Sequence, residues 1–157
     1  MLASYGAVDL ETALRFSWDL GIPVLPLGDR GTFHGACLRY EGRNVVVLKQ
    51  NSKHEARWLF DLIHELSHAG QTPEAPSLEV IEGDETSEER RNSAEEIAAS
   101  QFAGDVTLDG RAEELAQACV KAARGSVERL KQIVPSIAEQ NGVGVGALAN
   151  YMAFRLS

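Results

Sequence analysis

Apolar side chains recur with the helical period along residues 52–70, and this is the clearest pattern in the chain. The apolar positions are Trp58, Leu59, Leu62, Ile63 and Leu66. Their spacing puts them on one stripe of a helix. Ser52 followed by Glu55 has the form of a capping box, and Gly70 is a natural helix stop. The pattern therefore predicts a helix that begins near Ser52 and ends near Gly70.

The N-terminal third is predicted to contain one helix followed by short strands. Asp9 can cap a helix over residues 9–20. Residues 21–31 are apolar but contain two prolines, which fits a short edge strand better than a central one. Residues 32–40 and 44–50 are rich in β-forming side chains and are separated by three residues that include a glycine. We therefore expect these two segments to form a hairpin.

The chain changes character over residues 71–91. This stretch contains two prolines, a glycine and six glutamates, so we expect a long solvated loop. Helical patterns resume over residues 92–108 and 109–124 and again from Ser126, and the tail is predicted to form two short helices around residues 141–143. The whole pattern predicts an α+β fold, with a small sheet of about three strands packed on the best-defined helix and further C-terminal helices.

Length and composition limit the classes of protein that fit. Of the 157 residues, 44% are hydrophobic and 24% are charged, so we expect one domain over residues 1–157, with its C-terminal helical part at about 110–157. The net charge of −8 disfavours a general affinity for nucleic acid or an anionic membrane. The sequence has no signal-peptide pattern and no apolar run of roughly 18 residues. Since Cys37 and Cys119 form no motif, we expect a cytoplasmic protein with buried thiols and no disulfide.

Two histidines stand on the predicted helix with the spacing of a metal site, His64-Glu65-Leu66-Ser67-His68. At about 100° per residue, the two imidazoles share one side of the helix, Glu65 flanks them, and the aliphatic stripe points elsewhere. Two imidazoles one turn apart can bind one Zn²⁺, and the glutamate can act as a general base on a metal-bound water. The alternative is a pair of polar histidines on the helix surface, but the segregated apolar stripe favours the zinc site.

A catalytic zinc site needs a third protein ligand and an open position. Carboxylates at the start of the next helix are the best candidates, and spacing alone does not choose between Glu95 and Glu96. Asp61 lies on the ligand side of the histidine helix, one turn before Glu65. It is either an acceptor for an imidazole N–H, a like-charge neighbour of Glu65, or an ordinary solvated charge.

Residues 44–70 and 96–103 together resemble the ImmA/IrrE family of metallopeptidases. Members carry a strand, a helix with H-E-x-x-H, and then an E-x-x-A-N-x-F-A stretch. Here the second stretch reads Glu96-Ile97-Ala98-Ala99-Ser100-Gln101-Phe102-Ala103. The resemblance covers about residues 20–106 and the closing helices. It implies that Glu96 is the third ligand, with Ser100 in the place of the family's Asn, and that Ser67 replaces a common Gly.

The first functional hypothesis is a zinc-dependent endopeptidase. An extended protein substrate would add to the edge of the sheet, and His34, Tyr40 or Tyr151 are candidates for steadying an oxyanion. The resemblance further implies a cytosolic regulatory protease, often from a phage or mobile element, that acts on a helix-turn-helix repressor. We expect this protease to act without a membrane and without direct contact with nucleic acid.

Two other hypotheses remain open at the level of sequence. One is a DNA-binding regulator, because residues 137–156 read as a helix, a glycine turn and a second helix. In its second helix, only Asn150 and Arg155 are polar side chains that could contact DNA, so base and phosphate contacts would be sparse. The other is a metal-binding, antitoxin-like interaction protein that does not cleave its partner.

Overall fold

The computed structural model describes residues 8–28, 33–83 and 93–157, and it confirms the α+β class. Within these ranges the chain forms six helices and four strands. Their bounds are α1 (Leu10–Asp19), β1 (Val24–Pro26), β2 (Phe33–Tyr40), β3 (Arg43–Leu48), α2 (Glu55–Gln71), β4 (Leu78–Gly83), α4 (Ala94–Thr107), α5 (Ala112–Ala123), α6 (Val127–Asn141) and α7 (Val145–Leu156). No described helix is long and apolar enough to cross a membrane.

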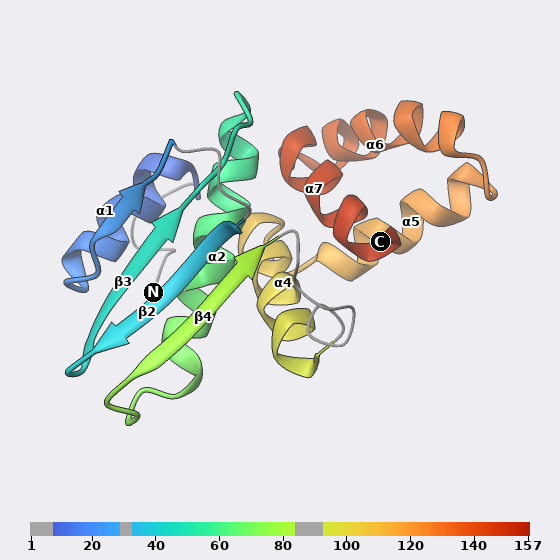
Figure 1. Ribbon diagram of the computed structural model, residues 1–157. Helices are drawn as coiled ribbons and strands as arrows, with labels where there is room; N and C mark the ends of the chain where they lie inside the picture. Colours follow the sequence, from blue (N-terminus) through green and yellow to red (C-terminus); the bar gives the residue numbers. More distant parts are fainter. Residues whose placement is uncertain (1–7, 29–32, 84–92) are drawn as a thin grey trace.

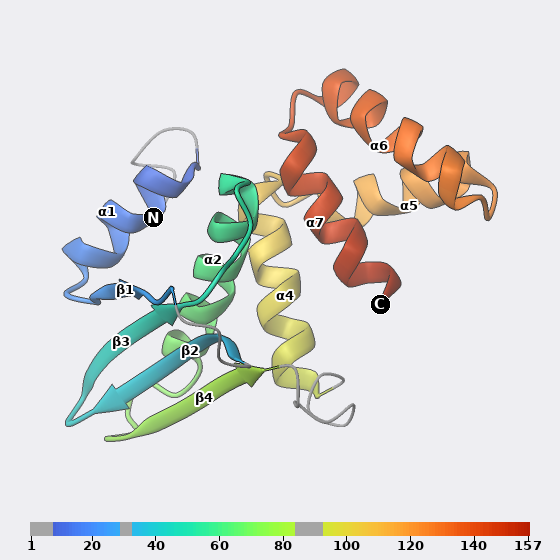
Figure 2. The same cartoon turned by 45° about the horizontal axis from the view of Figure 1, so that its top comes forward.

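The four strands form one sheet in the order β1-β3-β2-β4 (Figure 1). β1 pairs with β3 in parallel, while β2 pairs antiparallel with both β3 and β4. The predicted hairpin is β2–β3, and its tight turn places Glu41 and Gly42 at positive φ (48° and 76°), the backbone geometry that suits a two-residue hairpin turn. Helices α1 and α2 lie on the same side of the sheet (Figure 2). The prediction that residues 21–31 contain an edge strand is confirmed by β1.

The fourth strand corrects the prediction of a solvated loop over residues 71–91. Residues 78–83 alternate in the manner of a half-buried strand: Val80 is buried, whereas Glu79 and Ile81 are exposed. Glu79 therefore occupies the solvent side of a strand rather than a loop. The loop prediction failed because it rested on the high charge of the segment. The alternation that marks the strand covers only six residues. Residues 84–92 of the predicted loop lie outside the described residues.

The start of α2 is a second correction. The helix begins at Glu55 with His54 as its N-cap residue, so Ser52 does not form the predicted capping box. The Ser52 hydroxyl instead accepts a hydrogen bond from the His54 backbone N–H at 3.1 Å, and its carbonyl accepts one from the Trp58 indole at 2.8 Å. Ser52 thus shapes the turn before the helix. At its other end the helix runs one residue beyond Gly70.

The remaining helices mostly follow the sequence patterns. Asp9 caps α1 by accepting from the Thr12 N–H at 2.8 Å, and Ser126 caps α6 by accepting from the Arg129 N–H at 3.3 Å. The fourth helix and the first tail helix, predicted as separate, are one helix, because α6 continues through Pro135. The C-terminal helices α5, α6 and α7 pack beyond α4, away from the sheet (Figures 1 and 2).

Alternate residues of β2 face α2, and they set how closely strand and helix approach. Gly35 lies against the Glu65 side chain, and Cys37 packs with Ala69 in a small apolar cluster. The Arg39 guanidinium donates to the Ala69 carbonyl at 2.5 Å. The predicted free, buried state of both cysteines is confirmed. Because β2 pairs with a strand on each side, these contacts fix α2 to an interior strand of the sheet.

Candidate metal centre

The structure brings three potential metal ligands together from two helices. His64 and His68 stand on α2 and Glu96 on the first turn of α4. The two imidazole Nε2 atoms are 3.1 Å apart, and Glu96 Oε2 lies 3.2 Å from Nε2 of His64 and 3.5 Å from Nε2 of His68. Within the described ranges this is the one group of three such residues whose ligand atoms all lie within 4.8 Å of one another. The three residues are therefore positioned to bind a metal ion.

The spacing of these atoms fits a tetrahedral ion. An ion bonded to nitrogen and oxygen at about 2.0–2.1 Å holds its ligand atoms about 3.3 Å apart. The three observed separations, 3.1, 3.2 and 3.5 Å, bracket that value. Three protein ligands of this kind leave a fourth position for water or substrate.

The contacts behind the imidazoles are compatible with the tautomer that metal binding needs. Nδ1 of His64 lies 3.1 Å from the Ser100 hydroxyl oxygen, and Nδ1 of His68 lies 3.3 Å from the Gln71 amide oxygen. Both oxygens can accept from a protonated Nδ1, which leaves the lone pair of each Nε2 facing Glu96. Ser100, which stands where the resemblance expects Asn, thus still offers an acceptor. No sequence pattern pointed to Gln71, because its contact with His68 depends on where α2 ends.

Burial decides two questions that the sequence left open. His64 and His68 are buried, 7% and 1% exposed, so the alternative of a polar pair on the helix surface is wrong. Glu96 is buried while its neighbour Glu95 is exposed, and Glu96 is the carboxylate that reaches the imidazoles. The cap at Ser93, which accepts from the Glu96 N–H at 3.3 Å, begins α4 at the point that orients this side chain.

Glu65 points between α2 and the sheet. Its side chain is 1% exposed and lies against Gly35 of β2. Burial and the nearby negative charge of Glu65 together raise the pKa of the Cys37 thiol to about 11. Glu65 thus lies between the helix that carries both histidines and an interior strand of the sheet.

Asp61 has partners that the sequence did not suggest. Its carboxylate accepts a hydrogen bond from the Gln50 side chain at 2.7 Å and pairs with Arg57 at 3.2 Å. Its side chain is 13% exposed, so the reading as an ordinary solvated charge is wrong. Since Gln50 follows β3, this contact ties the middle of α2 to the end of a strand.

Of the three oxyanion candidates, none is brought to the histidines by a described contact. The His34 side chain lies outside the described residues. Tyr40 is 75% exposed at the end of β2. The Tyr151 hydroxyl donates to Glu113 at 3.4 Å, and its ring packs on Gly104, eight residues and roughly 12 Å further along α4 than Glu96.

The second helix of the helix-turn-helix-like segment is largely committed to packing. In α7, Leu148, Tyr151 and Met152 are buried. Arg155, one of its two polar readers, pairs with Glu113 of α5 at 3.1 Å. These contacts count against DNA reading by α7.

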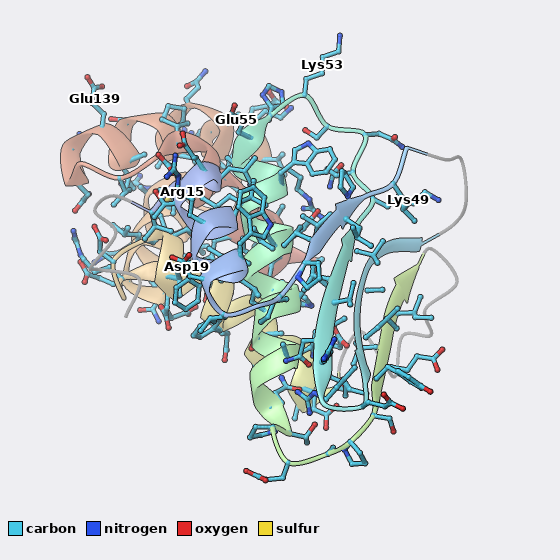
Figure 3. The ribbon with its side chains drawn as sticks, turned by 90° about the vertical axis from the view of Figure 1, so that its left-hand side faces the viewer. Arg15, Asp19, Lys49, Lys53, Glu55 and Glu139 are labelled. Carbon is cyan, nitrogen blue, oxygen red and sulfur yellow. The ribbon has the colours of Figure 1, made fainter. Side chains whose placement is uncertain are left out.

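Two hollows on the surface are lined by neither His64 nor His68. One runs along α1 and is lined by Arg15 and Asp19, among others, and one at the start of α2 includes Lys53. Glu55 lines both (Figure 3). Neither contains a member of the His64, His68 and Glu96 group.

Comparison with known proteins bears directly on the group of His64, His68 and Glu96. Residues 19–151 match the model of a peptidase family described as the IrrE N-terminal-like domain. No curated protein and no solved structure matches the chain significantly. The matched range contains both histidines, Glu65 and Glu96, and it extends over most of the chain. The chain therefore belongs to the IrrE N-terminal-like peptidase family, as the resemblance indicated.

Proposed function

We propose that this chain is a zinc-dependent endopeptidase with His64, His68 and Glu96 as metal ligands and Glu65 as the general base. One observation carries the proposal: the two Nε2 atoms of α2 and a carboxylate oxygen of α4 lie 3.1–3.5 Å from one another, and α2 also bears a buried glutamate beside the first histidine. Nitrogen and oxygen donors of this number and spacing suit Zn²⁺.

Different residues orient the metal ligands and transfer the proton. A bound Zn²⁺ would polarise the scissile carbonyl and acidify water. Ser100 and Gln71 keep the imidazoles in the orientation in which Nε2 faces the ion. The Glu65 carboxylate takes a proton from the attacking water and returns it to the nitrogen of the leaving amine, so that it ends the cycle as it began.

The edge strand β4 is the best candidate for holding the substrate. It is the last strand of the sheet on the side opposite β1, and its outer side chains include the exposed Glu79 and Ile81. An edge strand can pair with an extended peptide, and a negatively charged edge favours a basic one. A flexible, basic linker of a helix-turn-helix repressor has this chemistry. We therefore propose a repressor of this kind, in the cytoplasm, as the substrate.

The first experiment separates ligands from base. Purified wild type should contain about one zinc per chain by elemental analysis. Glu65→Gln should keep the metal and lose hydrolysis, because an amide cannot take up the proton. Glu96→Gln should lose metal affinity, and the matched exposed control Glu95→Gln should not. A wild type that binds no zinc after incubation with it would reject the metal centre.

The second experiment tests the substrate. The repressor encoded beside this protein is incubated with the zinc-loaded enzyme, and the products are followed by mass spectrometry, with Glu65→Gln as control. We expect one cut in a flexible linker and a rate that falls as salt rises. An intact repressor would reject this substrate, and equal cutting by the Glu65→Gln variant would reject the mechanism.

A further inference from the structure

We propose that Gly35 of β2 is a positioning residue, whose missing side chain leaves the space in which the Glu65 carboxylate lies. The role in catalysis rests on the proposed function of Glu65 as the base. The steric relation between the two residues does not, and it can be measured separately.

The distances leave no room for a side chain at this position. A Cβ atom built on Gly35 would lie 2.3 Å from Glu65 Oε1, 3.1 Å from its Cδ and 3.4 Å from its Cγ. The first distance is far inside van der Waals contact, and all three close atoms belong to the same side chain. Even alanine at position 35 would therefore have to move the carboxylate of Glu65.

Steric space, rather than backbone freedom, explains the glycine. Gly35 does not have a positive φ, unlike Gly42 in the hairpin turn. A glycine inside a strand weakens the strand and often marks a place where another group approaches the backbone closely. Here the approaching group is Glu65, whose side chain is 1% exposed.

The strand cannot easily retreat from an added methyl group. Gly35 pairs with Leu48 of β3 on one side and with Glu82 of β4 on the other. Two and four positions along, Cys37 and Arg39 of the same face are packed against α2. The register with β4 shifts between residues 33 and 35, and irregularities of this kind re-aim residues beside functional sites. Since α2 and β2 are both held, the carboxylate is the part that would move.

Gly35→Ala should therefore lower turnover without removing the metal. Displacement of a catalytic group by about 1 Å costs on the order of 100-fold in rate. We expect kcat to fall by about that factor, while KM and the zinc content stay close to those of the wild type. Gly70→Ala is the matched control, because an added Cβ there meets nothing within 4 Å.

A double-mutant cycle tests the positioning itself. Thermal unfolding of the full-length chain is measured for wild type, Gly35→Ala, Glu65→Ala and the double variant, each zinc-loaded and EDTA-treated. We expect Gly35→Ala to lower Tm in the wild-type background and to lower it far less in the Glu65→Ala background, with or without zinc. This coupling is independent of any peptidase activity, so it stands even if the proposed function fails.

Three results would overturn the proposal. The first is an equal loss of Tm from Gly35→Ala in both backgrounds, which would mean that other atoms meet the methyl group. The second is a Gly35→Ala variant with unchanged kcat. The third is a loss of zinc that parallels the loss of turnover, which would assign Gly35 to the metal site as a whole. If Gly35→Ala alone does not fold, a folded double variant supports the proposal and an unfolded one refutes it.

Discussion

Replacement of Arg39 should destabilise the protein more than any exposed charge substitution, because this buried arginine binds the end of α2. Arg39 is buried, with only 4% of the residue exposed. It donates to the carbonyls of Ala69 at 2.5 Å, Thr72, and Ala75 at 3.1 Å, and to the Asn44 side chain at 2.6 Å. Carbonyls at a helix C-terminus lack partners within the helix, and a cation there also offsets the helix dipole.

The magnitude follows from which carbonyls water can reach. A hydrogen bond from a charged donor contributes about 1.5–3 kcal/mol, so four would give roughly 6–12 kcal/mol if all were lost without replacement. Thr72 is exposed and Ala75 half-buried, so water can replace the donor at those two carbonyls, whereas Ala69 is buried. We therefore expect Arg39→Met to lower the free energy of unfolding by about 3 kcal/mol, mostly from one buried carbonyl and the amide. For a chain of this length, that is a fall in Tm of roughly 6–12 °C.

The assay is urea and thermal unfolding followed by circular dichroism, with two comparison variants. Arg39→Lys keeps the charge but loses the planar fork, so it should fall between wild type and Arg39→Met. Arg15→Met removes an exposed pair with Glu11 and should change stability by less than about 0.5 kcal/mol. If Arg39→Met is no more destabilising than Arg15→Met, the end of α2 does not depend on this clamp and the reasoning is wrong.

Three further predictions concern other contacts. Gly104→Ala should destabilise the protein by about 1–3 kcal/mol in chemical unfolding, because its Cβ would lie 2.2 Å from the Tyr151 ring; a neutral effect would contradict the close helix packing. Ser100→Ala should weaken zinc binding by about 10-fold in competition with a chelator, since it removes the acceptor behind His64; unchanged affinity would argue against that acceptor. Because burial and a nearby carboxylate raise the pKa of Cys37 to about 11, its alkylation at pH 8 should be on the order of 100-fold slower than that of a free thiol and should quicken on unfolding. Fast labelling of the folded protein would refute this.

The sequence was sufficient for the parts of the site that lie within one helix. His64, Glu65 and His68 share a turn of α2, so their relative directions follow from helix geometry alone. Glu96 is different, because successive helical residues point about 100° apart and only the packing of α4 on α2 shows which carboxylate faces inward. The family resemblance supplied that choice before the structure did.

Contacts between distant segments were the ones that pattern reasoning missed. Glycine in a strand ordinarily signals a turn, a bulge or a weak position, so nothing near Gly35 pointed to Glu65, thirty residues later. Ser52 had the form of a cap, yet its carbonyl accepts a hydrogen bond from the Trp58 indole and Ser52 lies in the turn before the helix. β4 was obscured because Glu79, one of its outward positions, carries a charge that also suits a loop.

The short strand β1 has a consequence for self-association. The Pro23 carbonyl and the Leu27 N–H bond to β3, so residues 24 and 26, which alternate with them, turn their backbone groups outward. Pro26 has no N–H to offer there, and the rim of β1 can donate little to another chain. Leu25 and Leu27 are 49% and 42% exposed. Exposed apolar side chains beside unpaired backbone groups favour aggregation by strand pairing between chains. Pro26 therefore disfavours strand pairing at the β1 edge of the sheet. The β4 edge is then the one at which another strand can add.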